Sequence, residues 1–116
     1  MRGNKNTLEL NSYASEAART AVFPIDTGWD YLLSSLPEEV GEFSSIFAKA
    51  ARKGQGRKLT PEQHASAVSE LGDILWNVAL CARQLEVSLE AVAQKNLNKL
   101  ADRSKRGVIV GSGDSR

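Results

Sequence analysis

Glu38-Glu39-Val40-Gly41-Glu42 decides the fold of this chain together with a downstream counterpart, Glu70-Leu71-Gly72-Asp73. From Glu39 and from Glu70 onward, both stretches have one order: acid, apolar residue, glycine, acid. Both lie in segments with helical periodicity, and residues three apart share a helix face, so each segment presents two carboxylates side by side. A glycine inside a helix costs about 1 kcal/mol relative to alanine. Its presence beside two acids indicates close backbone approach or room for a ligand.

The acidic pairs border apolar faces of their helices. At about 100° per residue, Glu39 lies at the edge of an apolar arc and Glu42 just outside it. Glu70 and Asp73 border a second arc. If the two arcs pack together, the four carboxylates converge at one rim of a shared core, where they repel and raise one another's pKa. A hard divalent cation relieves this repulsion, and Mg²⁺ is the common choice beside phosphates. The first arc contains Leu36, Val40, Phe43, Phe47 and Ala50, and the second contains Leu71, Ile74, Leu75, Val78, Cys81, Ala82 and Leu85.

The composition is that of one ordinary domain. The chain has 116 residues, 41% of them hydrophobic and 25% charged, with a formal net charge of +1. This length suffices for a single domain over residues 1–116 with a real core. Near-neutral charge gives no general electrostatic case for a nucleic-acid or membrane partner. The longest uncharged helical run, Ile74 to Ala82, is too short to span a bilayer.

Cysteine usage and the N-terminus both favour a cytoplasmic protein. The single Cys81 excludes an intramolecular disulfide and suits a reducing compartment. It lies among apolar residues in a helical segment, which indicates a structural thiol in place of a nucleophile. The N-terminus lacks the apolar region of a signal peptide.

The pattern predicts an all-α fold with four main helices. A first helix from about Thr7 to Ala21, with a stripe of alanines, is ended by Pro24. Residues 25–34 then form a connector. The second helix begins near Ser35, where Ser35 and Glu38 have the spacing of a capping box, and it runs to about Lys53. Because of this capping explanation, and because Glu38 points further out, Glu38 ranks below Glu39 and Glu42 as a metal ligand.

The second half of the chain contributes two further helices. Residues 54–58 form a flexible basic loop. Thr60-Pro61-Glu62-Gln63 has the cap, proline and glutamine of a helix start, and the third helix runs to about Leu85. It is apolar on most sides, which predicts a central helix with a second apolar side for a subunit interface. Ser88 caps a fourth helix to about Lys105. Residues 1–6 and 111–116 are predicted to be flexible.

The fourth helix carries a polar face suited to phosphates. Asn96, Lys99 and Arg103 are spaced i, i+3, i+7, and a lysine, an arginine fork and an amide in a row suit a polyphosphate. A solvated basic last turn that complements the helix dipole is the alternative; the acidic motifs favour the phosphate interpretation. Lys53 and Arg57 are weaker candidates for the same task. His64 is alone and is predicted to lie at the surface.

These residues resemble the MazG-like nucleoside triphosphate pyrophosphohydrolases, an all-α family with a Glu-Glu-x-x-Glu motif followed at variable distance by Glu-x-x-Asp. Here the two motifs begin at Glu38 and Glu70, with 27 residues between them. The resemblance covers most of the chain from about Tyr13. Residues 20–24, 71–76 and 96–103 also match the family, and residues 106–116 resemble a subgroup of short bacterial and phage members.

The resemblance implies an assembly and a reaction. The fold would assemble into a multi-helix homodimer or homotetramer, with helices of neighbouring chains completing each site. The substrate would be a ribo- or deoxyribonucleoside triphosphate, cleaved between the α and β phosphates to the monophosphate and pyrophosphate. Among short phage-type relatives, a guanine nucleotide such as dGTP is the expected substrate. A phage-encoded member would act in the host cytoplasm.

The resemblance also assigns roles to residues. Glu39, Glu42, Glu70 and Asp73 would hold Mg²⁺, with Mn²⁺ able to take its place, and Glu38 would position or deprotonate the attacking water. The phosphates would contact the polar face of the fourth helix. Trp29, Trp76 and Asn77 are the candidates for stacking on or hydrogen-bonding the base, although core packing is the favoured role of both tryptophans.

Other functions agree less well with these residues. A helical di-metal oxidase wants Glu-x-x-His pairs, and Pro61 occupies the position three before His64. A nucleic-acid binder would need a clustered basic face. The alternative that stays open is a non-catalytic helical module that binds nucleotides or oligomerises.

Overall fold

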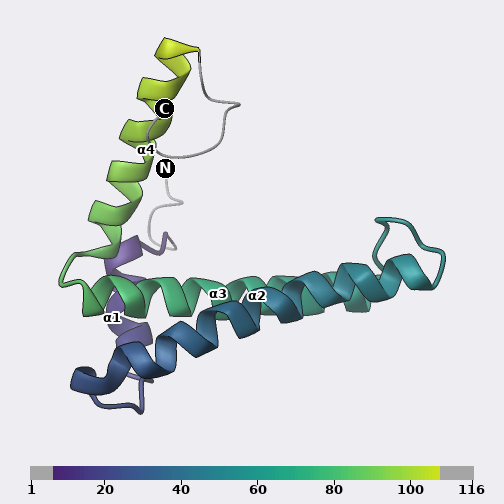
Figure 1. Cartoon of the computed structure of the whole chain (residues 1–116), viewed down its shortest axis with the longest axis horizontal. Helices are drawn as coiled ribbons and strands as arrows, with labels where there is room; N and C mark the ends of the chain where they lie inside the picture. The colour runs from purple at the N-terminus through teal and green to yellow at the C-terminus, as the bar shows by residue number, and fades with distance from the viewer. Residues whose placement is uncertain (1–6, 108–116) are drawn as a thin grey trace.

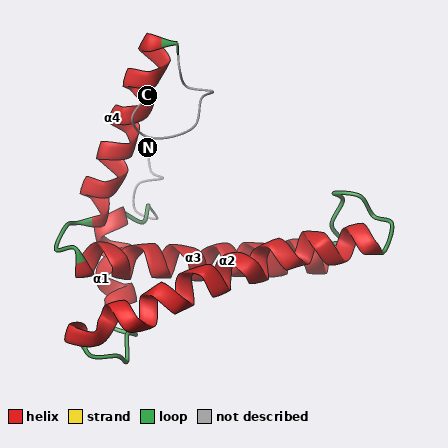
Figure 2. Ribbon diagram, in the orientation of Figure 1, coloured by secondary structure: helices red, strands yellow, loops and turns green. Residues whose placement is uncertain are grey.

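The structure, a computed structural model, describes residues 7–107 and is all-α over that range. Residues 1–6 and 111–116, predicted to be flexible, lie outside the described residues. The prediction of four main helices is confirmed (Figures 1 and 2). None of the described helices has the length and apolar character needed to cross a bilayer. The elements are α1 (Leu10–Ala18), the 3₁₀ helix η2 (Ile25–Thr27), α2 (Gly28–Arg52), α3 (Pro61–Gln84) and α4 (Leu89–Arg106).

Two long antiparallel helices form the frame of the molecule. α2 and α3 lie side by side as a hairpin, with more contact between them than between any other pair of described elements. α1 crosses this hairpin near the chain reversal from α3 to α4, and α4 rises away from it (Figure 1). The Cα radius of gyration is 17.2 Å, against about 13 Å for a compact chain of about 100 residues. The single chain is therefore an open, angular shape.

The α2–α3 interface has one register along its length. Gly28 faces Gln84, whose side-chain atoms lie 2.5–2.9 Å from where a Cβ on Gly28 would stand. From this pair we count forward along α2 and backward along α3 in alternating steps of four and three residues, the spacing typical of a coiled-coil seam. This spacing predicts further layers, each made of one residue from α2 and one from α3. The layers are Leu32 with Leu80, Ser35 with Asn77, Glu39 with Asp73, and Glu42 with Glu70. The first two of these layers are buried on both helices.

A second small core joins α1 to α3 and α4. Ala17, Ala79 and Leu89 are buried together, and Trp76 packs against them. The Trp76 Nε1 donates a hydrogen bond of 2.8 Å to the Oγ1 of Thr20, just past α1. The predicted alanine stripe of the first helix therefore does pack closely, and Trp76 has the structural role that was favoured for it.

The structure corrects the predicted boundaries of the first two helices. α1 spans Leu10–Ala18 where residues 7–21 were predicted, because the chain leaves the helix in turns that Thr20 closes by bonding the carbonyl of Ala17. The predicted connector over residues 25–34 is wrong beyond Thr27, since α2 begins at Gly28 and contains Pro37 within it. An interior proline costs about 3 kcal/mol, which the buried packing of Leu32 and Ser35 against α3 offsets.

The other predicted helix ends are confirmed. Thr60 accepts from the backbone N–H of Gln63, whose side chain accepts from the Thr60 N–H, which completes the capping box of α3. Ser88 caps α4 through the N–H of Ala91. Gly107 ends α4 with a φ of 74°, a left-handed conformation that glycine adopts without strain.

The leucine layer of the hairpin predicts a large effect of truncation. We expect Leu80→Ala to lower the free energy of unfolding by about 2–5 kcal/mol, because Leu80 is 1% exposed and its removal leaves a cavity against Leu32. Urea unfolding followed by circular dichroism measures this. Leu33→Ala is the matched control on the outward side of α2, where the side chain is 68% exposed. An equal loss in Leu33→Ala would contradict the assignment of the core to the α2–α3 seam.

Candidate active site

Three carboxylates lie close together at the acidic layers of the interface between α2 and α3. One carboxylate oxygen from each of Glu39, Glu70 and Asp73 lies within 4.8 Å of the others. Glu42 stands at the edge of this group, and it is close enough to Glu70 for the two side chains to share a hydrogen bond. The predicted convergence of acids from the two motifs is thus present in a single chain.

The acids perturb one another's ionisation. Partial burial raises the pKa of Glu39 to about 7, and the hydrogen bond to Glu70 and the charges of Asp73, Glu42 and Glu70 add to the effect. The charge of Glu70 raises the pKa of Glu42 above its ordinary value, with smaller contributions from desolvation and from Glu38. The side chains that raise these two pKa values, those of Glu38, Glu42, Glu70 and Asp73, are all acidic. The cluster therefore concentrates negative charge.

The donor set of this cluster fits a hard divalent cation. The Oε1 atoms of Glu39 and Glu70 are buried and have no hydrogen-bond partner among the described residues. A buried, unpaired carboxylate oxygen is costly unless a cation or a donor compensates it. Carboxylate oxygens are the ligands that Mg²⁺ takes in proteins. Glu39, Glu70 and Asp73 are the residues that would hold such an ion, with Glu42 beside them.

Glu38 lies next to the cluster without a structural task of its own. Ser35 is inside α2 and buried, so the predicted capping box of Ser35 and Glu38 does not exist. Glu38 is exposed, and its charge contributes to the raised pKa of Glu42 one turn away. The capping box is therefore removed as a reason for ranking Glu38 below the other acids, whereas its exposed position agrees with the prediction that it points further out.

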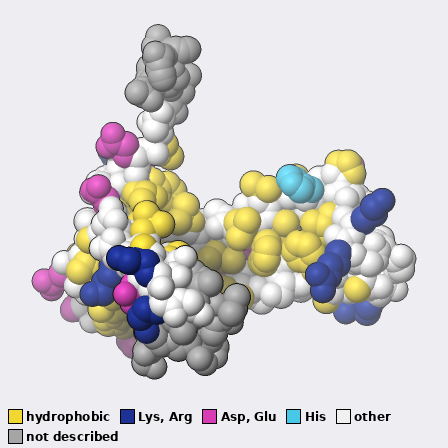
Figure 3. Space-filling model, turned by 90° about the horizontal axis from the view of Figure 1, so that it is seen from above, with side chains coloured by type: hydrophobic (Ala, Val, Ile, Leu, Met, Phe, Trp, Pro, Cys, Tyr) yellow, Lys and Arg dark blue, Asp and Glu magenta, His cyan; other side chains and the backbone are white. Residues whose placement is uncertain are grey.

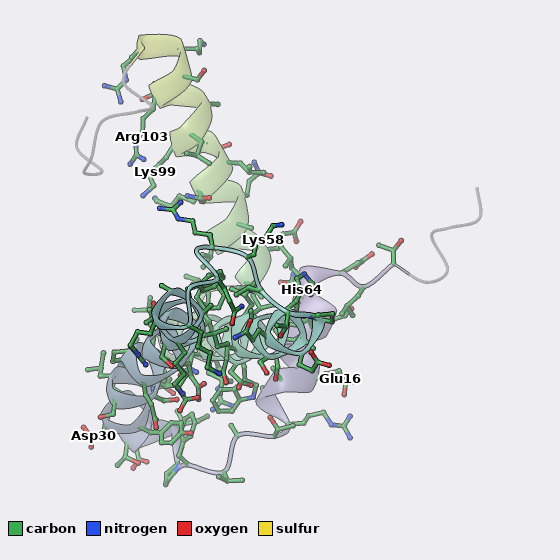
Figure 4. The ribbon with its side chains drawn as sticks, turned by 90° about the vertical axis from the view of Figure 1, so that its right-hand side faces the viewer. Glu16, Asp30, Lys58, His64, Lys99 and Arg103 are labelled. Atoms are coloured by element: carbon green, nitrogen blue, oxygen red, sulfur yellow. The ribbon has the colours of Figure 1, made fainter. Side chains whose placement is uncertain are left out.

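The phosphate candidates of α4 lie along a different surface. Asn96 and Lys99 line a groove of about 560 Å³ together with Leu75 and Val78 of α3. On α3, Leu75 points about 160° away from Asp73, at 3.6 residues per turn. Figure 4 shows Lys99 and Arg103 on the same side of α4. The single chain does not bring these residues to its own acidic cluster.

The weaker phosphate candidates lie at the far end of the hairpin. Lys53 follows the last residue of α2 and is fourteen residues beyond Glu39, which corresponds to about 20 Å along the helix axis. Arg57 lies in the loop that follows. Lysine and arginine side chains gather at this end of the molecule (Figure 3). Neither residue reaches the acidic cluster of its own chain.

The base candidates occupy three different environments. Trp29 lies half-buried in the first turn of α2. Trp76 contacts Phe23 and Tyr31 edge-on, with ring centroids 6.5 and 6.3 Å away. Asn77 is 1% exposed within the seam. Base contact by these three residues stays a prediction. His64 is exposed, as predicted.

Two features of this region were missed in the sequence. Phe23 and Tyr31 stack at 4.9 Å and form one aromatic cluster with Trp76. Ser35 forms a buried polar layer with Asn77 beside the acids. The residues from Gly28 to Glu42 that face α3 are spaced alternately four and three apart. This spacing includes Ser35 and could have predicted that it is buried. Of the two explanations for Gly41 and Gly72, close backbone approach is not present among the described residues, since no atom outside their own helix and their chain neighbours would lie within 4 Å of an added Cβ. Room for a ligand stays a prediction.

Comparison with known proteins gives the family. The model of the MazG nucleotide pyrophosphohydrolase domain matches residues 28–108. The chain belongs to the MazG nucleotide pyrophosphohydrolase family. The match begins at the first residue of α2 and includes both acidic motifs and α4. The family is thus shown over the part of the chain that builds the hairpin and the site.

One relative is similar over nearly the whole chain. The gene 37 protein of Mycobacterium phage L5 is 40% identical over 115 residues, which cover 94% of this chain and 100% of the phage protein. Its name states no activity. No solved structure matches the chain. The relative is therefore a phage protein of the same short format.

The mutual repulsion of the acids predicts an unusual pH dependence. Since the pKa of Glu39 is raised from 4.5 to about 7 on folding, the unfolded chain loses this proton at lower pH than the folded chain does. We expect the melting temperature of the metal-free MazG-family protein to fall as pH rises from about 4.5 to about 7. Calorimetry over this interval measures it. Glu39→Gln is the control, in which the fall should be smaller; an equal fall in both proteins would contradict the assignment to Glu39.

Proposed function

We propose that this protein hydrolyses a nucleoside triphosphate to the monophosphate and pyrophosphate in a Mg²⁺-dependent reaction. The observation that carries the proposal is the group of three carboxylates within 4.8 Å, with two buried unpaired oxygens, on the seam of a MazG-family chain. Nothing in a helical hairpin requires acids at seam positions, where apolar residues would stabilise the packing. A cation that brings a polyphosphate explains their presence.

Each acid has a role in this proposal. Glu39, Glu42, Glu70 and Asp73 hold Mg²⁺, and Mn²⁺ can take its place. The ion supplies neutralisation of phosphate charge and a water of lowered pKa. Glu38 is exposed beside Glu42 and accepts the proton of the attacking water. Water adds to phosphorus, the bond between the α and β phosphates breaks, and pyrophosphate leaves.

The phosphates are held by Asn96, Lys99 and Arg103 of a second copy. Within one chain Asn96 and Lys99 line the apolar groove on the other side of α3 from the acids, and Arg103 follows one turn further along α4. A homodimer or homotetramer in which α4 of one chain lies beside the hairpin of another joins the two halves of the site. Lysine and arginine then stabilise the charge that develops on the leaving pyrophosphate.

The exposed apolar surface supports such an assembly. Large hydrophobic side chains of α3 and α4 are between 36% and 64% exposed, and they lie along the hairpin and beside the groove (Figure 3). Contiguous apolar surface of this kind marks a protein interface. The open shape of the chain has the same explanation. The residues concerned are Val68, Leu71, Leu75, Leu85, Val92, Leu97 and Leu100.

For the substrate, we propose a guanine nucleotide such as dGTP, as expected from the resemblance to short phage-type members. The phage relative of the same length is consistent with this choice. Trp76 lies one turn from Asp73 on α3, and it forms an aromatic cluster with Phe23 and Tyr31. Trp29 is the second candidate for stacking.

A substrate panel tests the reaction. Purified protein with Mg²⁺ is incubated with each of the eight common ribo- and deoxyribonucleoside triphosphates, and monophosphate and pyrophosphate are quantified. We expect pyrophosphate release, fastest with dGTP, and none in the presence of a chelator. Release of free phosphate in place of pyrophosphate would contradict the cleavage position. Turnover of none of the eight would favour the non-catalytic nucleotide-binding module.

Mixing two inactive variants tests the shared site. Asp73→Asn removes an acid and Lys99→Ala removes a phosphate contact, and we expect each variant alone to lose nearly all turnover. When the two are unfolded together and refolded, about a quarter of wild-type activity should return, since random pairing of a symmetric dimer makes mixed dimers with one intact site. The control is the same treatment of Asp73→Asn with Glu42→Gln, which lie in one cluster and should not restore activity. No recovery in the first mixture would contradict phosphate binding by a second copy.

A further inference from the structure

The polar layer beside the acids contains a buried amide whose oxygen is unused. Asn77 is 1% exposed and Ser35 is 6% exposed. The spacing of the α2–α3 seam places them opposite each other, in the layer next to Glu39 and Asp73. The Oδ1 of Asn77 has no hydrogen-bond partner among the described residues. A buried amide oxygen without a donor is destabilising, and a leucine of the same shape would suit a seam position better.

The nitrogen of the same amide fixes which way this oxygen points. The Asn77 Nδ2 donates a hydrogen bond of 2.9 Å to the backbone carbonyl of Asp73. Because that carbonyl can only accept, the nitrogen must occupy this position and the oxygen must occupy the other. Side chains on a helix lean toward its N-terminus, so the amide of Asn77 lies over the turn that carries Asp73. Its acceptor is therefore held beside the acidic cluster.

The geometry points to Asn77 as a positioning residue for the hydration shell of the cation. Mg²⁺ keeps several waters when carboxylates bind it, and groups just outside the ligands orient those waters and tune affinity. In the cluster the carboxylates supply ligand oxygens, and the Oδ1 of Asn77 accepts a hydrogen bond from a water of the bound ion. The inference rests on the proposed metal site.

A second seam amide provides a matched control. Gln84 also has a buried carbonyl oxygen without a partner among the described residues, and its Nε2 donates to the backbone carbonyl of Ile25. Gln84 is seven residues beyond Asn77, which places it about 10 Å further from the acids along α3. The two amides thus share a buried oxygen without a partner and a bond to a backbone carbonyl, but Gln84 is half-buried and lies further from the cluster.

Binding of Mn²⁺ to the full chain without nucleotide, followed by electron paramagnetic resonance, tests the role. We expect Asn77→Leu to weaken Mn²⁺ binding about tenfold while the metal-free melting temperature stays the same or rises, and Gln84→Met to bind Mn²⁺ as the wild type does. Equal affinity in Asn77→Leu and wild type, or equal weakening in both variants, would overturn the inference. Failure of the wild type to bind Mn²⁺ would overturn the metal site itself.

Measurement on the unmodified protein guards against a variant that does not fold. In a Mg²⁺ titration followed by nuclear magnetic resonance, the side-chain amide signal of Asn77 should shift with the same midpoint as the backbone signal of Asp73. The side-chain amide of Gln84 should not shift. An unchanged Asn77 signal at saturating Mg²⁺ would overturn the inference whatever the variants do.

Discussion

Repulsion between carboxylates at core positions of two packed helices is the constraint on which this structure depends. Along the α2–α3 seam, the layers run from Gly28 and Gln84 through leucines to a buried amide and then to acids. From the leucine layer toward the acids, each layer of the seam is more polar than the one before it. The hairpin holds the acidic layers together because the leucine layer, the small core around Ala17 and the helix caps stabilise it. Stability is thus concentrated at one end of the seam and charge in its middle.

This distribution of stability and charge corresponds to different roles for the helices. The hairpin carries the acids and fixes their relative positions, while α1 closes the leucine end through Ala17 and the bond between Thr20 and Trp76. α4 contributes Leu89 of its first turn to the small core, and further along it presents lysines beside an apolar groove. A chain built in this way has a well-packed part and a part whose packing surface faces outward.

Much of the fold followed from local sequence, and the departures have physical causes. The helix count, the caps at Thr60 and Ser88 and the meeting of the two acidic motifs all depend on short-range patterns that the sequence displays directly. The start of α2 was wrong because Ser35 and Pro37 imitate a helix N-terminus, whereas the packing of Leu32 on Leu80 extends the helix back to Gly28. Tertiary contact overrode a local signal.

The candidate site was predictable only in part. Ser35 and Glu39 of α2 and Asn77 of α3 all occupy positions with the spacing of the seam. An apolar arc drawn for each helix alone, however, does not show which residues of the two helices will oppose one another. The register comes from the pair of helices, and Gly28 against Gln84 is the contact that reports it. Lys99 lies on α4. A single chain does not determine whether α4 is placed beside the acids, so the surroundings of Lys99 were not predictable from the sequence.

The register of the hairpin also bears on how such chains can diverge. The loop from Lys53 to Lys58 joins the helices far from the acids, and the seam, not this loop, decides which residues oppose one another. Relatives can therefore gain or lose residues in the loop without moving a carboxylate. One residue inserted inside either helix, between the acidic motif and the leucine layer, would instead rotate the acids by about 100° relative to the packed leucines. The tolerance for insertions should accordingly be high at the tip of the hairpin and very low between each acidic motif and the leucine layer.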